Sequence, residues 1–183
     1  MKKILLITFL IFFSLNSNAQ NFKTLFNKVE KFKTQEEFDS VDKDILEAIN
    51  YLLTHKYKEK TENYFYALKS MIDWMDGTSK YAIILGGKIS DDIGTNNLMV
   101  NMYMASMAKY LLEERFNKNR YIDVQKQKDK KFMERDNVRE IQLNGAKILF
   151  NYIENYAETK INKKLKKAVR AYKKDKLYEY MYN

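Results

Sequence analysis

The chain has 183 residues, no cysteine, one histidine and a formal net charge of +9 at pH 7. Without cysteine it has no disulfide, no catalytic thiol and no cysteine-linked lipid, so its stability depends on an apolar core. The usual Cys and His sets of zinc sites are excluded as well. The basic charge favours anionic partners, but AT-rich coding would also produce this abundance of Lys, Asn, Ile, Tyr and Phe without proline.

Residues 1–19 have the pattern of a cleaved secretory signal peptide. Lys2 and Lys3 precede an apolar run over 4–15, and Ser17-Asn18-Ala19 supplies small residues for a cleavage site. The run is shorter than the roughly 20 apolar residues of a membrane-spanning helix. Cleavage would leave 183 − 19 = 164 residues with 31 basic and 24 acidic side chains. We therefore expect an exported protein that is periplasmic or secreted, soluble and not a lipoprotein.

Residues 20–183 are predicted to form one all-α domain, a single irregular bundle of five or six helices, because apolar residues recur at helical spacing. A short first helix is expected over 22–32. Thr34-Gln35-Glu36-Glu37 has the spacing of a capping box, in which Thr34 and Glu37 satisfy each other's backbone N–H groups. The second helix is expected to start there and to continue for about five turns.

The third helix is predicted over 62–76. Gly77 is expected to end it in the left-handed conformation, which glycine enters without strain. Residues 77–97 hold four of the five glycines and are predicted to form a structured loop. The fourth helix, over 97–116, is apolar nearly all round, which is typical of the central helix of a bundle.

The second half of the chain is predicted to be helical after a charged interruption. Residues 117–133 form either a linker or an exposed helical extension. A fifth helix is expected over 138–156, and residues 160–183 form a basic terminal helix with a Tyr-rich tail. No run of alternating residues predicts a strand, apart from the weak pattern over 81–85.

The third helix and the loop after it carry one resemblance. The residues, in order, are Ala67-Leu68-Lys69, Met71-Ile72, Trp74-Met75, Gly77-Thr78, Tyr81, Gly86, Lys88-Ile89 and Met102-Tyr103-Met104-Ala105. Over 67–110 this order resembles a family of uncharacterised exported all-helical proteins of Gram-negative bacteria. The resemblance implies a helical fold and export, and it implies no activity.

No motif indicates an enzyme. His55 is the only histidine and is interpreted as a cap near the end of the second helix, where positive charge suits the helix dipole. Asp91-Asp92 fails the EF-hand pattern, because Ile89 would occupy its first position. Gly86-Gly87-Lys88 lacks the upstream glycine and the following hydroxyl of a P-loop. We expect no catalytic residue, no metal and no cofactor.

The basic terminal helix is the strongest candidate for a binding surface. Residues 160–176 contain nine basic residues and one acidic residue, a net charge of +8. If the stripe Ile161-Leu165-Ala168-Tyr172 packs on the bundle, a cationic face stays in water and could bind anionic lipid or polysaccharide; nucleic acid is not an expected partner. Two structural interpretations stay open, a merely solvated face or pairing with the acidic segment 36–47. The candidate residues are Lys163, Lys166, Lys167, Arg170, Lys173 and Lys174.

A second candidate is a groove that has Trp74 as its aromatic floor, with the glycine-rich loop and Tyr81 at its rim. The alternative is that Trp74 simply packs this loop against the third helix.

Together these features predict a non-catalytic binding or interaction protein of the bacterial cell envelope, whose partner is an unidentified protein or envelope component. The alternative is a polyanion- or membrane-surface-binding protein that acts through the basic terminal helix.

Overall fold

A computed structural model describes residues 22–57 and 61–183, and over these residues every regular element is a helix. The all-α prediction is therefore confirmed, whereas the predicted signal peptide lies outside the described residues. None of the helices in the described part is long and apolar enough to cross a membrane. The helices are α2 (Phe22–Val29), α3 (Gln35–Asp39), α4 (Asp42–Thr54), α5 (Glu62–Gly77), α6 (Gly87–Ile93), α7 (Asn97–Lys118), a 3-10 turn η1 (Phe132–Glu134), α8 (Asp136–Asn155), α9 (Lys163–Lys173) and α10 (Leu177–Tyr182).

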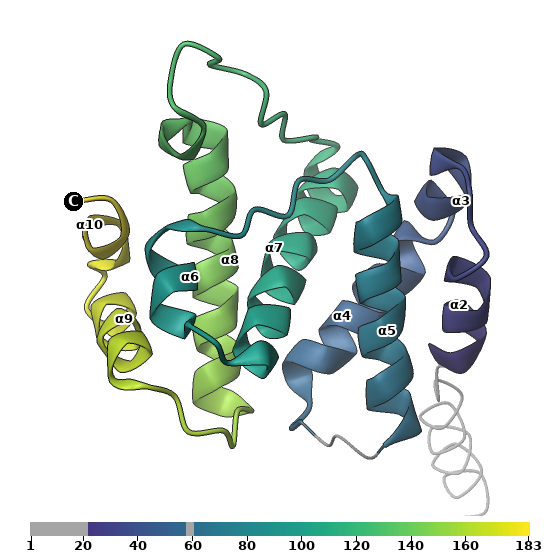
Figure 1. The fold of residues 1–183 in the computed structure, drawn as a ribbon, viewed down its shortest axis with the longest axis horizontal. Coiled ribbons are helices and arrows are strands. Elements are labelled where there is room, and N and C mark those ends of the chain that lie inside the picture. Colours follow the sequence, from purple (N-terminus) through teal and green to yellow (C-terminus); the bar gives the residue numbers. More distant parts are fainter. Residues whose placement is uncertain (1–21, 58–60) are drawn as a thin grey trace, which may run out of the picture.

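The helices are arranged in two groups around a central pair. Figure 1 shows α7 and α8 side by side in the middle of the molecule, where they make the most extensive contact of any pair. On one side, α4 and α5 pack together, α4 rests on α7, and α2 covers α5. On the other side, α6, α9 and α10 pack on one another; α9 and α10 also contact α8, and α6 contacts α7. The basic helix α9 and the acidic helix α3 therefore lie toward opposite ends of the long axis (Figure 1).

The central position of α7 follows from its composition. Its buried residues are distributed around the whole helix and include Met102, Met107 and Leu112, each fully inaccessible. A helix without a polar face has to be covered on all sides. It comes close to α8 at Gly145, where an added Cβ would lie 2.5 Å from Cγ of Met107. Glycine at this position lets the two helices pack closely.

The predicted count of five or six helices is wrong, because the described residues contain nine α-helices and one 3-10 turn. The capping box is confirmed: Oγ1 of Thr34 accepts from the N–H of Glu37, whose Oε2 accepts from the N–H of Thr34. The helix that it starts ends after five residues, however, and α4 begins separately at Asp42. At this break the Asp42 carboxylate turns into the core. The uninterrupted apolar stripe of the predicted second helix did not indicate this burial.

Two further breaks account for the rest of the difference. The segment predicted as a loop over 77–97 contains α6, and Gly86 precedes it with a φ of 136°, a conformation that favours glycine. The terminal helix divides into α9 and α10 at Asp175, whose φ is 54°. Residues 119–131, by contrast, hold no helix, in agreement with the linker interpretation of the charged segment.

Gly77 was expected to adopt the left-handed conformation, and that prediction is wrong. It is the last residue of α5, and it is not among the residues with positive φ. The lack of space for a side chain at this position explains the glycine instead. An added Cβ would lie 1.9 Å from Cζ of Phe38, which packs against this turn of α5. Glycine is required here by the aromatic ring of α3, not by the backbone angle.

Candidate functional site

The basic helix α9 is fixed at its first residue by a single asparagine. Oδ1 of Asn162 accepts from the N–H of Leu165 at 2.9 Å and so caps the helix. Nδ2 of the same side chain donates to the backbone carbonyl of Asp92 in α6 at 2.7 Å. One side chain therefore both starts α9 and attaches it to its neighbour.

One side of α9 packs into the protein. Leu165, Ala168 and Val169 are buried, and the ring of Tyr172 contacts that of Phe150 in α8 with centroids 5.7 Å apart. At 100° per residue these positions form a continuous stripe. The opposite half of the helix surface is left to the basic side chains.

All six candidate residues of the basic face are exposed, as the periodicity predicts. Only Lys173 forms an ion pair, through its Nζ with Oε1 of Glu154 at 2.6 Å. Within residues 22–57 and 61–183 the other members form no ion pair. Their charges are therefore not neutralised by ion pairs within this part of the chain. The basic face consists of Lys163, Lys166, Lys167, Arg170, Lys173 and Lys174.

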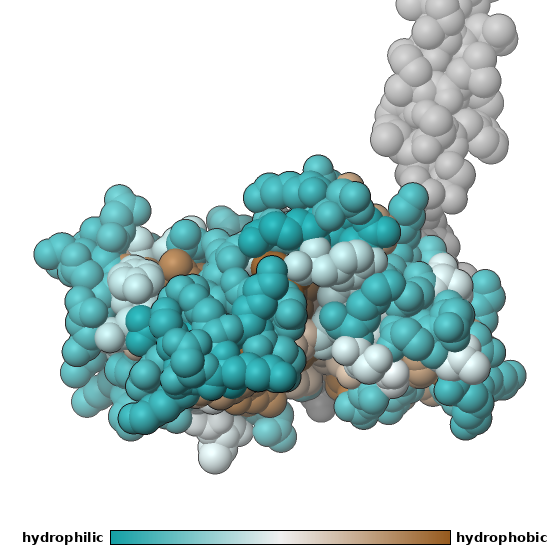
Figure 2. Space-filling model, turned by 90° about the horizontal axis from the view of Figure 1, so that it is seen from above, coloured by the Kyte–Doolittle hydropathy of each residue, from teal (hydrophilic) through white to brown (hydrophobic). Residues whose placement is uncertain are grey.

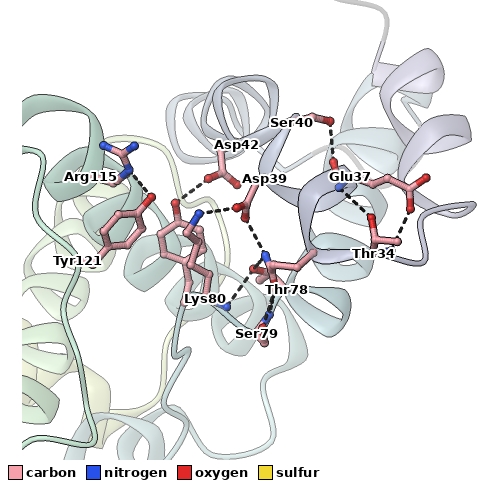
Figure 3. Close-up of polar contacts among 12 residues, drawn as sticks. Thr34, Glu37, Asp39, Ser40, Asp42, Thr78, Ser79, Lys80, Arg115 and Tyr121 are labelled. Carbon is pink, nitrogen blue, oxygen red and sulfur yellow. Dashed lines mark hydrogen bonds and ion pairs between the residues drawn. The ribbon is translucent and has the colours of Figure 1, made fainter.

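The acidic segment 36–47 does not pair with this face. The carboxylate of Asp39 binds the ammonium of Lys80, and that of Glu37 is used in the capping box. Figure 3 shows these contacts together with Tyr121, whose ring lies near both Lys80 and Arg115. Glu37 and Asp39 are thus part of separate polar contacts at the other end of the molecule. Of the two structural interpretations of the basic face, only the solvated face agrees with this arrangement.

A buried carboxylate, which the sequence offered only within the rejected EF-hand pattern, anchors the other end of the basic helix. The side chain of Asp92 in α6 is almost fully buried; it accepts from the hydroxyl of Tyr180 in α10 at 2.7 Å and from the ammonium of Lys88. Burial and this hydrogen bond raise the pKa of the Tyr180 hydroxyl. The ammonium of Lys88 also lies 4.6 Å from the centroid of the Tyr180 ring. Asp92 therefore holds α10, and with it the end of α9, on α6.

The spacing of these residues gives no local signal of their contact. Lys88 and Asp92 are four residues apart, a common helical ion pair. Tyr180 lies 88 residues away and is one of several tyrosines in the tail. Only covariation between the two segments could have revealed the pair from sequences.

Trp74 and Tyr81 lie in the core. Trp74 is fully buried, Tyr81 is nearly so, and their ring centroids are 5.3 Å apart. Both donate to the buried carboxylate of Asp42, Nε1 of Trp74 at 3.1 Å and the Tyr81 hydroxyl at 2.6 Å. Burial raises the pKa of Asp42, while the two hydrogen bonds oppose that effect. In this arrangement Trp74 attaches α5 to α4 and Tyr81 attaches the following loop, and the buried Trp74 ring is not open to a ligand.

His55 is placed at the end of α4. Its Nδ1–H donates to the backbone carbonyl of Tyr51 at 2.9 Å, and its ring stacks on the Tyr51 ring with centroids 4.1 Å apart. These are the contacts of a helix-terminal cap. Over the described residues, no group of three or more His, Cys, Asp or Glu side chains is positioned to hold a metal ion.

The face of the molecule seen from above is mainly hydrophilic, with hydrophobic atoms in small areas between polar ones (Figure 2). The large exposed apolar side chains of the described residues, such as Phe65, Leu85 and Tyr178, lie on different helices and loops. Isolated exposed apolar residues are normal for a protein surface. The basic face is therefore the strongest candidate site.

In comparisons with protein-family models, curated proteins and solved structures, no match to this chain was found. The resemblance carried by residues 67–110 stays a prediction. The functional argument accordingly depends on the geometry and charge of this chain alone.

Proposed function

We propose that this chain is a non-catalytic binding protein of the bacterial cell envelope, and that the basic face of α9 is its binding surface for anionic envelope polymers or lipids. One observation carries the proposal: six cationic side chains occupy one exposed face, and only Lys173 has an anionic partner among the described residues. The opposite side of the same helix is packed in the core. A partner can therefore reach the face without any rearrangement of the fold.

The physical basis of this binding is long-range attraction. Segment 160–176 has a net charge of +8, most of the excess charge of the whole chain. A row of like charges on one face attracts a multivalent anion, and binding releases counterions. The affinity therefore depends strongly on salt concentration. Packing of an apolar partner surface would lack that dependence. Salt sensitivity therefore distinguishes this mechanism from a protein partner held by apolar contacts.

Charge reversal at Lys166, Lys167, Arg170 and Lys173 tests the proposal. Each cation near an anionic surface contributes about 1 kcal/mol. Loss of the four attractions alone would therefore weaken binding by about 4 kcal/mol, or roughly a thousandfold in affinity. We expect the purified protein to bind heparin and phosphatidylglycerol vesicles at low salt, and the reversal variant to bind neither. Circular dichroism of the variant should remain helical, because all four side chains are exposed.

A matched control separates the position of the charges from their number. Glutamate at Lys28, Lys31, Lys126 and Lys128 changes the net charge by the same amount, at exposed positions whose side chains form no ion pair in the described structure. This control should keep most of the binding. Equal loss in both variants would show that net charge alone matters, and absence of binding by the wild type at low salt would refute the proposal.

A further inference from the structure

A surface cavity that is open to solvent lies where the turn between α6 and α7 meets the start of α9. Its volume is about 730 Å³, which is within the usual range for sites that bind small molecules. One wall is formed by Asp91, Gly94 and Thr95, and the other by Lys160, Lys163 and Lys164.

The two walls are tied together by hydrogen bonds that do not depend on a ligand. Nδ2 of Asn162 donates to the carbonyl of Asp92 at 2.7 Å and lies 3.4 Å from that of Ile93. Asn162 also caps α9, and Asn96 caps α7 on the opposite wall by accepting from the N–H of Met99 at 3.1 Å. The relative position of the walls is therefore set by the fold. A ligand would find the cavity already formed.

The charges that line the cavity have no ion-pair partner among the residues that the structure describes. Lys160, Lys163 and Lys164 are exposed, and none of them forms a hydrogen bond or an ion pair with another side chain of the described residues. Asp91 is the one acidic side chain in the lining, and it too has no partner there. The three lysines and the one aspartate of the lining together carry a net charge of +2.

This combination points to a ligand with two kinds of polar group. The ammonium groups favour a phosphate or carboxylate. A ligand that is anionic throughout would be repelled by Asp91, whereas hydroxyl groups can donate to its carboxylate and to the hydroxyl oxygen of Thr95. A bare inorganic anion would also leave most of the volume unfilled. The fit is to a polyhydroxylated ring that carries one acidic substituent.

We propose that this cavity binds a single acidic sugar unit, a saccharide that carries a phosphate or carboxylate group, with the acidic group against the three lysines and the hydroxyl groups toward Asp91 and Thr95. The inference rests on the proposed function, because it names the unit of an anionic polymer that the site would hold. The basic face then provides general attraction, and the cavity provides recognition of one residue of the polymer.

Titration of the purified protein with four small probes tests the assignment: glucose 6-phosphate, glucuronate, glucose and inorganic phosphate, followed by calorimetry. Saturable binding of one molecule of glucose 6-phosphate or glucuronate is expected, and comparison of these two shows whether phosphate or carboxylate is preferred. Glucose and inorganic phosphate should each bind at least tenfold more weakly, because each supplies only one of the two kinds of group.

Two triple variants with equal charge identify the location. Glutamine at Lys160, Lys163 and Lys164 should weaken binding of the acidic sugar at least tenfold. Glutamine at Lys166 and Lys167 of α9 and at Lys174 directly after it, all outside the cavity lining, should change it less than twofold. Both variants should keep the helical circular dichroism of the wild type, since all of these side chains are exposed.

Asp91→Ala tests the role given to the hydroxyl groups. The preference for glucose 6-phosphate over inorganic phosphate should fall at least threefold, because the carboxylate that accepts from the sugar and repels a bare anion is gone. An unchanged preference would overturn the orientation proposed for the sugar.

Failure of this inference is distinguishable from failure of the proposed function. Equal weakening in the two lysine variants, or no binding of either acidic sugar by a wild type that is still retained on heparin, would overturn the cavity assignment and leave the basic face intact. Binding of phosphatidylglycerol vesicles with no binding of either sugar would overturn it in favour of a lipid. Loss of heparin retention by the wild type would instead refute the proposed function.

Discussion

The contact between Gly77 and Phe38 yields a prediction that separates two explanations of one glycine. In Gly77→Ala the added methyl group would lie 1.9 Å from Cζ, 2.3 Å from Cε1 and 2.5 Å from Cε2 of Phe38. These distances are far below van der Waals contact, and the ring is buried, so it has to shift. Overpacking of this kind costs about 1–3 kcal/mol, while replacement of a helical glycine by alanine returns at most about 1 kcal/mol.

We expect Gly77→Ala to lower the free energy of unfolding by about 2 kcal/mol. This is near the upper end of the net cost, because several ring atoms are too close to the added methyl group. The assay is urea unfolding followed by far-ultraviolet circular dichroism. The same substitution is then made in a Phe38→Leu background, which removes the ring atoms that the methyl group would meet. There Gly77→Ala should be neutral or slightly stabilising, so the coupling between the two positions should be about 2 kcal/mol or more.

The alternative explanation, a left-handed glycine at the end of the helix, predicts a different result. Strain in the backbone would cost about 1–2 kcal/mol whatever side chain stands at position 38. Equal effects of Gly77→Ala in the two backgrounds, within about 0.5 kcal/mol, would therefore refute the reasoning from the Phe38 ring.

Three further outcomes are expected. N-terminal sequencing of protein from the native envelope or medium should begin at Gln20; recovery of intact Met1 in a soluble cytoplasmic pool would contradict export. His55→Ala should change the unfolding free energy by less than about 1 kcal/mol, because the side chain is an exposed cap, and elemental analysis should find no stoichiometric zinc. The pKa of Asp42 is raised by burial, so the folded state binds its proton more tightly than the unfolded state, and this residue lowers stability as pH rises above 3.8. As the pH rises, Asp42→Asn should therefore become more stable relative to the wild type, as measured by urea unfolding at several pH values. A stability difference that does not change with pH would refute the raised pKa of Asp42.

Much of the helical structure could be read from local patterns. The apolar stripes of α5, α7 and α8, the capping box at Thr34 and the basic face of α9 all depend on residues within a few positions of one another. Spacing along one helix determines which side chains share a face. For this reason the exposure of Lys166 and Arg170 was predictable, although their partner was not.

Other features of the structure are set by contacts between segments that are distant in the chain, and local sequence patterns do not predict them. The break between α3 and α4 accompanies the turning of Asp42 into the core, where its partners are 32 and 39 residues away. Gly77 faces a ring from another helix, and Asp92 depends on a tyrosine of the tail.

The cavity beside α9 has the same origin. The lysines of one wall and Asp91 of the other are separated in the chain by two whole helices, α7 and α8, and come together only when α9 packs on α6. The sequence by itself determined the main helical segments, their apolar sides and the cationic side of the last long helix, because these follow from short-range periodicity. Which polar side chains became buried, which glycines could not be replaced and where the charged cavity formed were decided by the tertiary structure, because each requires atoms from segments whose meeting no local pattern records.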